Sequence, residues 1–134
     1  MSDNVSFDGF DELLSTVRSL GQVGNKINNK ALKEGSKIVL AEQKRQAPVG
    51  ENNSREKLTT GNIKKYKNGN AYLSVGITKD NWEECKGLWF QNFNGIHSSG
   101  KHVGWISKAY EKVKSKATEA MMKVISDEVD KILK

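Results

Sequence analysis

The last quarter of the chain carries an apolar pattern that strongly limits how it can fold. Apolar side chains recur there at steps of three and four residues, at Tyr110, Val113, Ala117, Ala120, Met121, Val124, Ile125, Val129 and Ile132. Charged side chains largely occupy the other positions, so the pattern has the period of an α-helix with one apolar face. We therefore predict an amphipathic helix from about Ser107 to Leu133, the longest element that the sequence predicts.

The first 50 residues predict two shorter helices. The apolar stripe of the first consists of Phe10, Leu13, Leu14, Val17 and Leu20. Asp8 stands at its N-cap, and Gly21 and Gly24 end it. The second helix runs from about Val23 or Asn25 to Gln46, and Pro48 ends it.

Gly35 interrupts the apolar face of this second helix, which carries Ile27, Ala31, Leu32, Ile38 and Val39. Glycine costs about 1 kcal/mol relative to alanine inside a helix. Two interpretations remain open: another backbone approaches closely at Gly35, or the glycine is merely tolerated.

The centre of the chain predicts a loop followed by strands. Residues 50–61 are polar and lack periodicity, which indicates a loop that serves as a contact arm. Asn68-Gly69 then separates two strand-like runs, 61–67 and 70–78, and predicts a hairpin with a two-residue turn. Leu88–Phe93 fits either a short helix or a strand, and we favour a third strand.

These elements define an α+β fold in a single domain, residues 1–134. A small antiparallel sheet, with a hairpin at about 61–78 and a third strand at 88–93, is packed by the N-terminal helix pair and the long C-terminal helix. A chain of 134 residues is the usual size of one compact domain.

The charge is positive overall and unevenly distributed. The net charge is +6, but residues 1–29 carry −2, so the remainder carries +8. Such a balance favours a polyanion, either a nucleic acid or an acidic protein. The sequence shows neither a secretion signal nor an apolar run long enough to span a bilayer, so we expect a soluble protein made inside the cell, without membrane contact.

The residue patterns give no catalytic, cofactor-binding or metal-binding site. Residues 95–101 match a phosphate-binding loop, but His102 stands where the pattern needs Ser or Thr to hold Mg²⁺. His97, His102 and the single cysteine, Cys85, form too thin a ligand set for zinc. Cys85 also lacks an evident base, so we expect it to be inert. The sequence therefore predicts a protein that is not an enzyme.

Aromatic residues gather in the second half of the chain. Six of the ten lie after position 80: Trp82, Trp89, Phe90, Phe93, Trp105 and Tyr110. They either fill the core or anchor a protein interface. A third interpretation, in which bases stack on the rings beside Lys64, Lys65 and Lys67, has no supporting motif.

The order of features along the chain is more informative than any single feature. Three stretches define this order. The first is Phe7–Leu14, a short strand, a glycine and an acidic-capped helix; the second is Asn29–Gly35, which leads to Ala47-Pro48-Val49. The third is Trp89–Gly95, followed by Trp105, Ala109, Tyr110 and the amphipathic helix. In this order the chain resembles the head-tail joining family of siphophages and related prophages, also called tail-completion or neck proteins.

The resemblance implies a structural virion protein that completes the tail and helps join it to the head, as a subunit of a homo-oligomeric ring without catalysis or cofactor. Its partners would be other head-tail connector and tail proteins, with no sequence-specific nucleic acid. It would be assembled in the bacterial cytoplasm and reside in the virion. The expected interface residues are Arg55, Leu58, Trp82, Trp89, Phe90, Phe93 and Trp105.

Two other functions stay open at this stage. One is a tail-terminator ring protein, which differs from a neck protein in position rather than in chemistry. The other, more distant, is a basic nucleic-acid-binding module, which salt-dependent retention on DNA would support.

Overall fold

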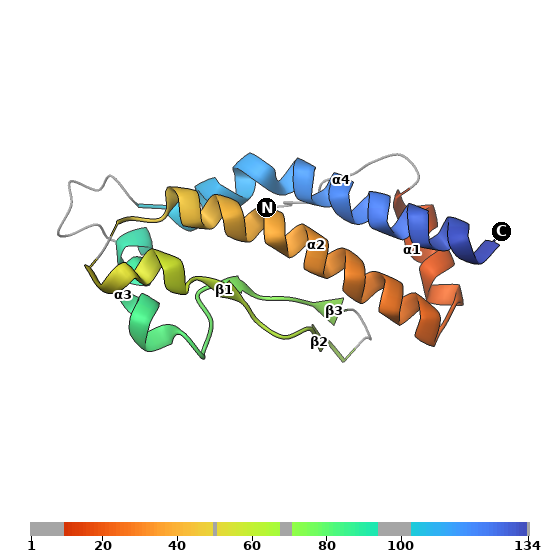
Figure 1. Ribbon diagram of the computed structural model, residues 1–134, viewed down its shortest axis with the longest axis horizontal. Helices are drawn as coiled ribbons and strands as arrows, with labels where there is room; N and C mark the ends of the chain where they lie inside the picture. Colours follow the sequence, from red (N-terminus) through yellow and green to blue (C-terminus); the bar gives the residue numbers. More distant parts are fainter. Residues whose placement is uncertain (1–9, 50, 68–70, 94–102, 134) are drawn as a thin grey trace.

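The protein is described here by a computed structural model, which describes residues 10–49, 51–67, 71–93 and 103–133 (Figure 1). The helices are α1 (Phe10–Ser19), α2 (Gln22–Gln46), α3 (Trp82–Phe93) and α4 (Trp105–Leu133), with a 3-10 helix η1 (Glu51–Lys57) after α2. Short antiparallel strands complete the fold between η1 and α3. The predicted α+β class, with its long C-terminal helix, is confirmed.

Helices α2 and α4 lie side by side and antiparallel, and they form the frame of the molecule (Figure 1). Their packing depends on small side chains: Ala31, Ala109 and Ala117 are buried between larger neighbours. A Cβ added to Gly35 would lie 2.7 Å from the Met121 sulfur and 3.6 Å from the Ala117 carbonyl oxygen. The tight contact at Gly35 is therefore with the Met121 side chain, while the α4 backbone lies at ordinary van der Waals distance.

Helix α1 closes one end of this frame. Its Val17 is buried with residues of α2 and α4 in a first core cluster of Val17, Ile27, Ala31, Ile125 and Val129. Gly24 of α2 lies directly against the carbonyl group of Val17, so the two helices approach too closely for a side chain at this point. Asp8, the predicted N-cap of α1, lies outside the described residues.

The hairpin lies along α2 on the side away from α4 (Figure 1). Strand β1 (Thr59–Thr60) pairs with β4 (Val75–Gly76), and β2 (Lys64–Lys65) pairs with β3 (Ala71–Tyr72). The predicted hairpin at about 61–78 is thus confirmed. Thr60 faces Val75 while Lys64 faces Tyr72, so one strand has an extra residue between the two ladders, as in a β-bulge. The turn at 68–70 lies outside the described residues.

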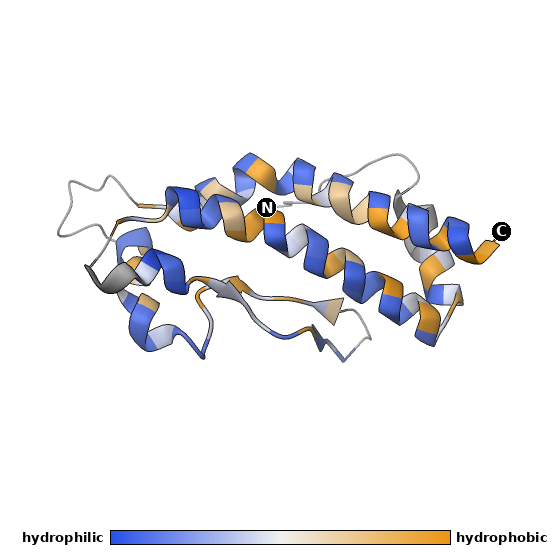
Figure 2. Cartoon of the chain, in the orientation of Figure 1, coloured by the Kyte–Doolittle hydropathy of each residue, from blue (hydrophilic) through white to orange (hydrophobic). Residues whose placement is uncertain are grey.

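The second end of the frame is covered by η1 and α3. A second core cluster lies there, composed of Ala47, Leu58, Cys85, Leu88 and Trp105, with Leu40, Ile77 and Ile106 packed against it. Figure 2 shows apolar and polar residues interspersed along both α2 and α4. Along the described ranges of the chain, no helix combines the length and apolar content needed to cross a bilayer.

Two sequence predictions fail in this region. Leu88–Phe93 is the second half of helix α3, so the third strand was wrong. Asn81 followed by Glu84 is a typical helix-start pattern, which should have favoured a helix from Trp82. The loop expected at 50–61 is also wrong for most of its length, because Glu51–Lys57 form η1 and Thr59–Thr60 form β1.

The buried carboxylate of Glu42 on α2 forms an ion pair with α4 and so links the two frame helices. Its carboxylate accepts hydrogen bonds from Arg45 and Gln46 on its own helix, and it lies 3.8 Å from the Lys112 ammonium on α4. These donors hold the pKa of Glu42 at about 2, well below its ordinary value of 4.5. The hydrogen bonds from Arg45 and Gln46 contribute most to this shift.

The packing of α1 predicts opposite effects for two helical glycines. Gly24→Ala should destabilise the protein by about 1–3 kcal/mol, because the new methyl group meets the Val17 backbone. Gly87→Ala, on open surface in α3, should stabilise it by about 0.5–1 kcal/mol. Urea unfolding of the two variants measures both; equal stability of the two would contradict the close approach at Gly24.

Glu42 predicts a pH dependence of stability. Because its pKa is lower in the folded protein, its contribution is present above about pH 4.5 and is lost as the pH falls towards 2. The free energy of unfolding of wild type should therefore fall over this interval more steeply than that of Glu42→Gln. Parallel slopes for the two proteins, measured by urea titration at each pH, would contradict the prediction.

Candidate contact surface on helix α3

Helix α3 is apolar over more than its buried face. Cys85, Leu88 and Asn92 face the core. The four aromatic residues of the helix lie on the adjacent arc, rotated by about 110° at the 3.6-residue period, and face solvent. We name this set the aromatic platform: Trp82, Trp89, Phe90 and Phe93.

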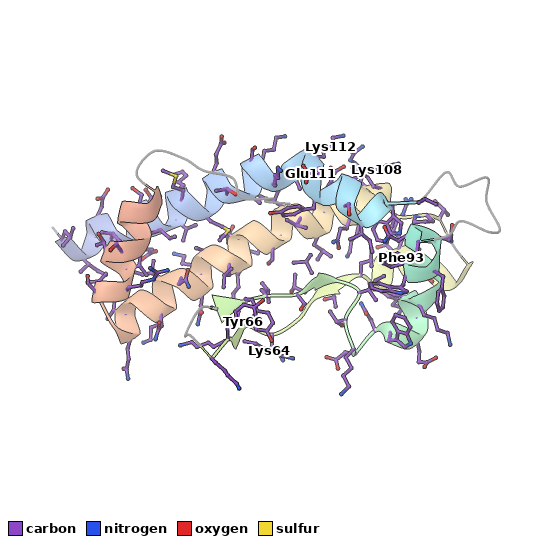
Figure 3. All side chains as sticks on the ribbon, turned by 180° about the vertical axis from the view of Figure 1, so that it is seen from behind. Lys64, Tyr66, Phe93, Lys108, Glu111 and Lys112 are labelled. Atoms are coloured by element: carbon purple, nitrogen blue, oxygen red, sulfur yellow. The ribbon has the colours of Figure 1, made fainter. Side chains whose placement is uncertain are left out.

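The platform residues contact each other and leave much of their surface uncovered. The ring centroids of Trp82 and Trp89 are 6.1 Å apart, those of Trp82 and Phe90 6.2 Å, and those of Trp89 and Phe93 4.7 Å. Their exposed fractions range from 37% at Trp82 to 60% at Phe93. Figure 3 shows Phe93 at the end of the molecule formed by α3. Contiguous exposed aromatic surface of this kind typically marks a binding site.

A hollow adjoins the platform. It has a volume of about 400 Å³ and is lined by Ile77, Thr78, Lys79, Trp82 and Trp89. The hollow lies between the end of the hairpin and α3, so an apolar side chain from a partner could enter it beside the two tryptophans. Glu83 and Lys86 of α3 form an ion pair at 3.0 Å, which leaves the platform side of the helix close to neutral.

Asn81 fixes the start of α3. Its side-chain oxygen accepts a hydrogen bond from the Thr78 amide at 2.7 Å, and its side-chain nitrogen donates to the carbonyls of Lys57 and Gly76 at 2.8 and 2.9 Å. Asn81 is buried, so these bonds are shielded from water. One side chain thus connects η1, β4 and α3, a role that the sequence analysis missed.

Asn92 and Trp105 fix the other end of α3 to the start of α4. The Asn92 side-chain oxygen accepts a hydrogen bond from the Ile106 amide at 3.0 Å, so α3 supplies a cap for α4. The Trp105 indole donates to the Leu88 carbonyl at 2.9 Å. Because both ends of α3 are fixed, the platform is held in a defined orientation.

The seven predicted interface residues separate into two groups. The four of the platform are exposed and adjacent, but Leu58 and Trp105 lie in the second core cluster, with 1% and 2% of their surface exposed. Arg55 is half-buried, and its guanidinium donates to the Ala47 carbonyl after the end of α2. These three residues therefore contact the surrounding structure, and of the seven only the four platform residues present exposed apolar side chains.

Within the described residues, the side chains that the sequence offered as nucleophile or metal ligands form no reactive arrangement. Burial raises the pKa of the Cys85 thiol, which therefore stays protonated and is a poor nucleophile. His97, His102 and the loop of residues 95–101 lie outside the described residues. Within the described ranges, no three His, Cys, Asp or Glu side chains lie close enough together to hold a metal ion.

The structure is that of a small α+β protein with an exposed aromatic platform. Residues 11–85 match the model of a family described as "Bacteriophage HK97-gp10, putative tail-component". The match covers more than half of the chain, and the protein belongs to this HK97-gp10-like family of phage tail components. No curated protein and no solved structure shows significant similarity to the chain.

The different environments of two tryptophans predict different costs of the same substitution. Trp105→Phe should destabilise the protein by about 1–3 kcal/mol, because it removes a buried hydrogen bond and leaves unfilled volume. Trp89→Phe, at a 38% exposed position, should change stability by less than about 0.5 kcal/mol. Denaturant unfolding compares the two variants; equal losses would contradict the assignment of Trp89 to an exposed surface.

Proposed function

We propose that the protein is a structural subunit of a ring that completes the phage tail and helps join it to the head, without catalysis. The observation that carries the proposal is the aromatic platform, which is exposed in the single chain and rigidly held. Membership of a family of phage tail components supports a place in the virion among other tail proteins.

The distribution of apolar residues supports assembly. Only 36% of the residues are hydrophobic, yet four large aromatic side chains lie on the surface rather than in the core. Aromatic residues are enriched at the centres of protein interfaces, where they lose contact with water on binding. The single chain leaves these side chains exposed, and assembly buries them against a partner.

We assign the platform to the contact with a neighbouring copy in the ring. Closed rings form through heterologous contacts, in which one surface of a subunit binds a different surface of the next. The platform occupies only the α3 end of the elongated molecule, so it can bind one neighbour while the opposite end stays free for another (Figure 1).

The proposal predicts that Phe90→Ser/Phe93→Ser folds normally but fails to assemble, because both side chains are more than half exposed. Light scattering of the purified protein and complementation of a phage that lacks the gene measure assembly and joining. Tyr66→Ser, which removes an aromatic side chain of similar exposure (58%) from the hairpin, away from the platform, is the matched control.

The outcomes separate the parts of this proposal. If the platform variant assembles but does not complement, the platform contacts a head or tail neighbour instead of another copy. If it assembles and complements, the platform has no role in the proposed function. Electron microscopy of the phage without the gene tests the function itself: filled heads and separate tails support it, and fully joined infectious virions would refute it.

A further inference from the structure

A second surface, distant from the platform, has a different chemistry. A groove of about 500 Å³ runs between α2 and the hairpin. Its floor is apolar, with Leu40, Ile63 and Leu73, and its walls carry polar and cationic side chains: Asn29, Lys33, Ser36, Lys37, Thr60 and Asn62. We name it the cationic groove.

Lysines extend along the α2 side of this groove. Lys26, Lys33, Lys37 and Lys44 are seven, four and seven residues apart, which places them in one row along the helix. Lys30 lies at the edge of the same row. At 1.5 Å per residue, the row from Lys26 to Lys44 is about 27 Å long.

The hairpin supplies more positive charge beyond the other wall. Lys64 and Lys65 on β2, together with Lys67, are exposed. Between them, Tyr66 stacks on Tyr72 of β3 with ring centroids 4.4 Å apart. Figure 3 shows Lys64 and Tyr66 on the hairpin, on the side of α2 opposite α4.

Few carboxylates offset this charge. Lys37 pairs with Glu34 and Lys30 with Glu128. Lys26, Lys33, Lys44 and the three hairpin lysines form no ion pair with any residue that the structure describes. The free charge thus concentrates on this face and attracts a polyanion over a distance comparable to the Debye length, about 8 Å at physiological salt.

We propose that the cationic groove binds the phosphate backbone of double-stranded DNA without regard to sequence. The walls combine lysines with Asn, Ser and Thr side chains, the types that contact DNA phosphates and sugars. A row of lysines about 27 Å long also fits a line of phosphates better than a single acidic peptide. The inference rests on the proposed function only in identifying the DNA as the phage genome at the head-tail junction.

Fluorescence anisotropy with two labelled 20-base-pair duplexes of unrelated sequence tests the proposal on the purified full chain. Wild type should bind both duplexes with equal affinity, and log K should fall linearly with log salt concentration, by about 0.9 per phosphate contacted. Lys33→Gln/Lys64→Gln should reduce the magnitude of this slope by about 2, or about 1 per lysine removed.

Lys108→Gln/Lys116→Gln is the matched control, because it removes the same charge from exposed positions on α4. It should leave the slope within experimental error of wild type. No salt-dependent binding by wild type, or equal loss in the two double variants, would overturn the proposal. So would loss of joining by the groove variant with its DNA binding unchanged, since the groove would then bind an acidic protein.

Complementation with the same variants distinguishes this inference from the proposed function. A groove variant that loses DNA binding but still joins heads to tails leaves the function intact and supports DNA binding as a separate property. If the phage without the gene forms normal virions while the groove variant loses DNA binding as expected, the groove inference stands and the proposed function fails.

Discussion

The close antiparallel packing of α2 on α4 is the contact on which the rest of the molecule depends. Small residues lie where the two helices meet: Ala31 is fully buried, and a Cβ added at Gly35 would press on the Met121 side chain. Each other element attaches to this pair at a defined point. Helix α1 attaches through Gly24, β4 through the Gln43 side chain, which donates to the Val75 carbonyl, and α3 through Trp105 at the start of α4. If α2 and α4 came apart, the residues of both core clusters would therefore lose their contacts.

The sequence predicted the helices that have a single apolar face. The stripes of α2 and α4 show the 3.6-residue period clearly, because charged and polar residues occupy most positions outside each apolar face. Helix α3 has no such contrast: its inner arc packs on the core and its outer arc carries the platform, so Leu88-Trp89-Phe90 reads as a continuous apolar run. Periodicity cannot distinguish such a run from a buried strand, whereas the Asn81–Glu84 helix-start pattern could have done so.

The site was predictable only in part, because residue type does not determine burial. Trp89 and Trp105 have the same chemistry and lie in the same aromatic segment, yet one is exposed and the other is 2% exposed with its indole bonded to Leu88. That difference depends on contacts between α3 and α4. The contacting residues are too far apart in the sequence for a local pattern to show them. Asn81 and Asn92 were missed for the same reason: their partners on η1, β4 and α4 are set by the tertiary fold.

The two surfaces differ in the forces they offer a partner, and this difference suits them to separate tasks. The platform is nearly neutral and aromatic, so binding there depends on apolar burial and changes little with salt. The cationic groove offers long-range attraction that falls as salt rises. Because the platform lies on α3 and the groove between α2 and the hairpin, a subunit could hold its neighbour through one surface and keep the other directed at a polyanion. The same α2–α4 frame carries both, because α2 forms one wall of the groove and α3 is fixed to the start of α4 through Trp105.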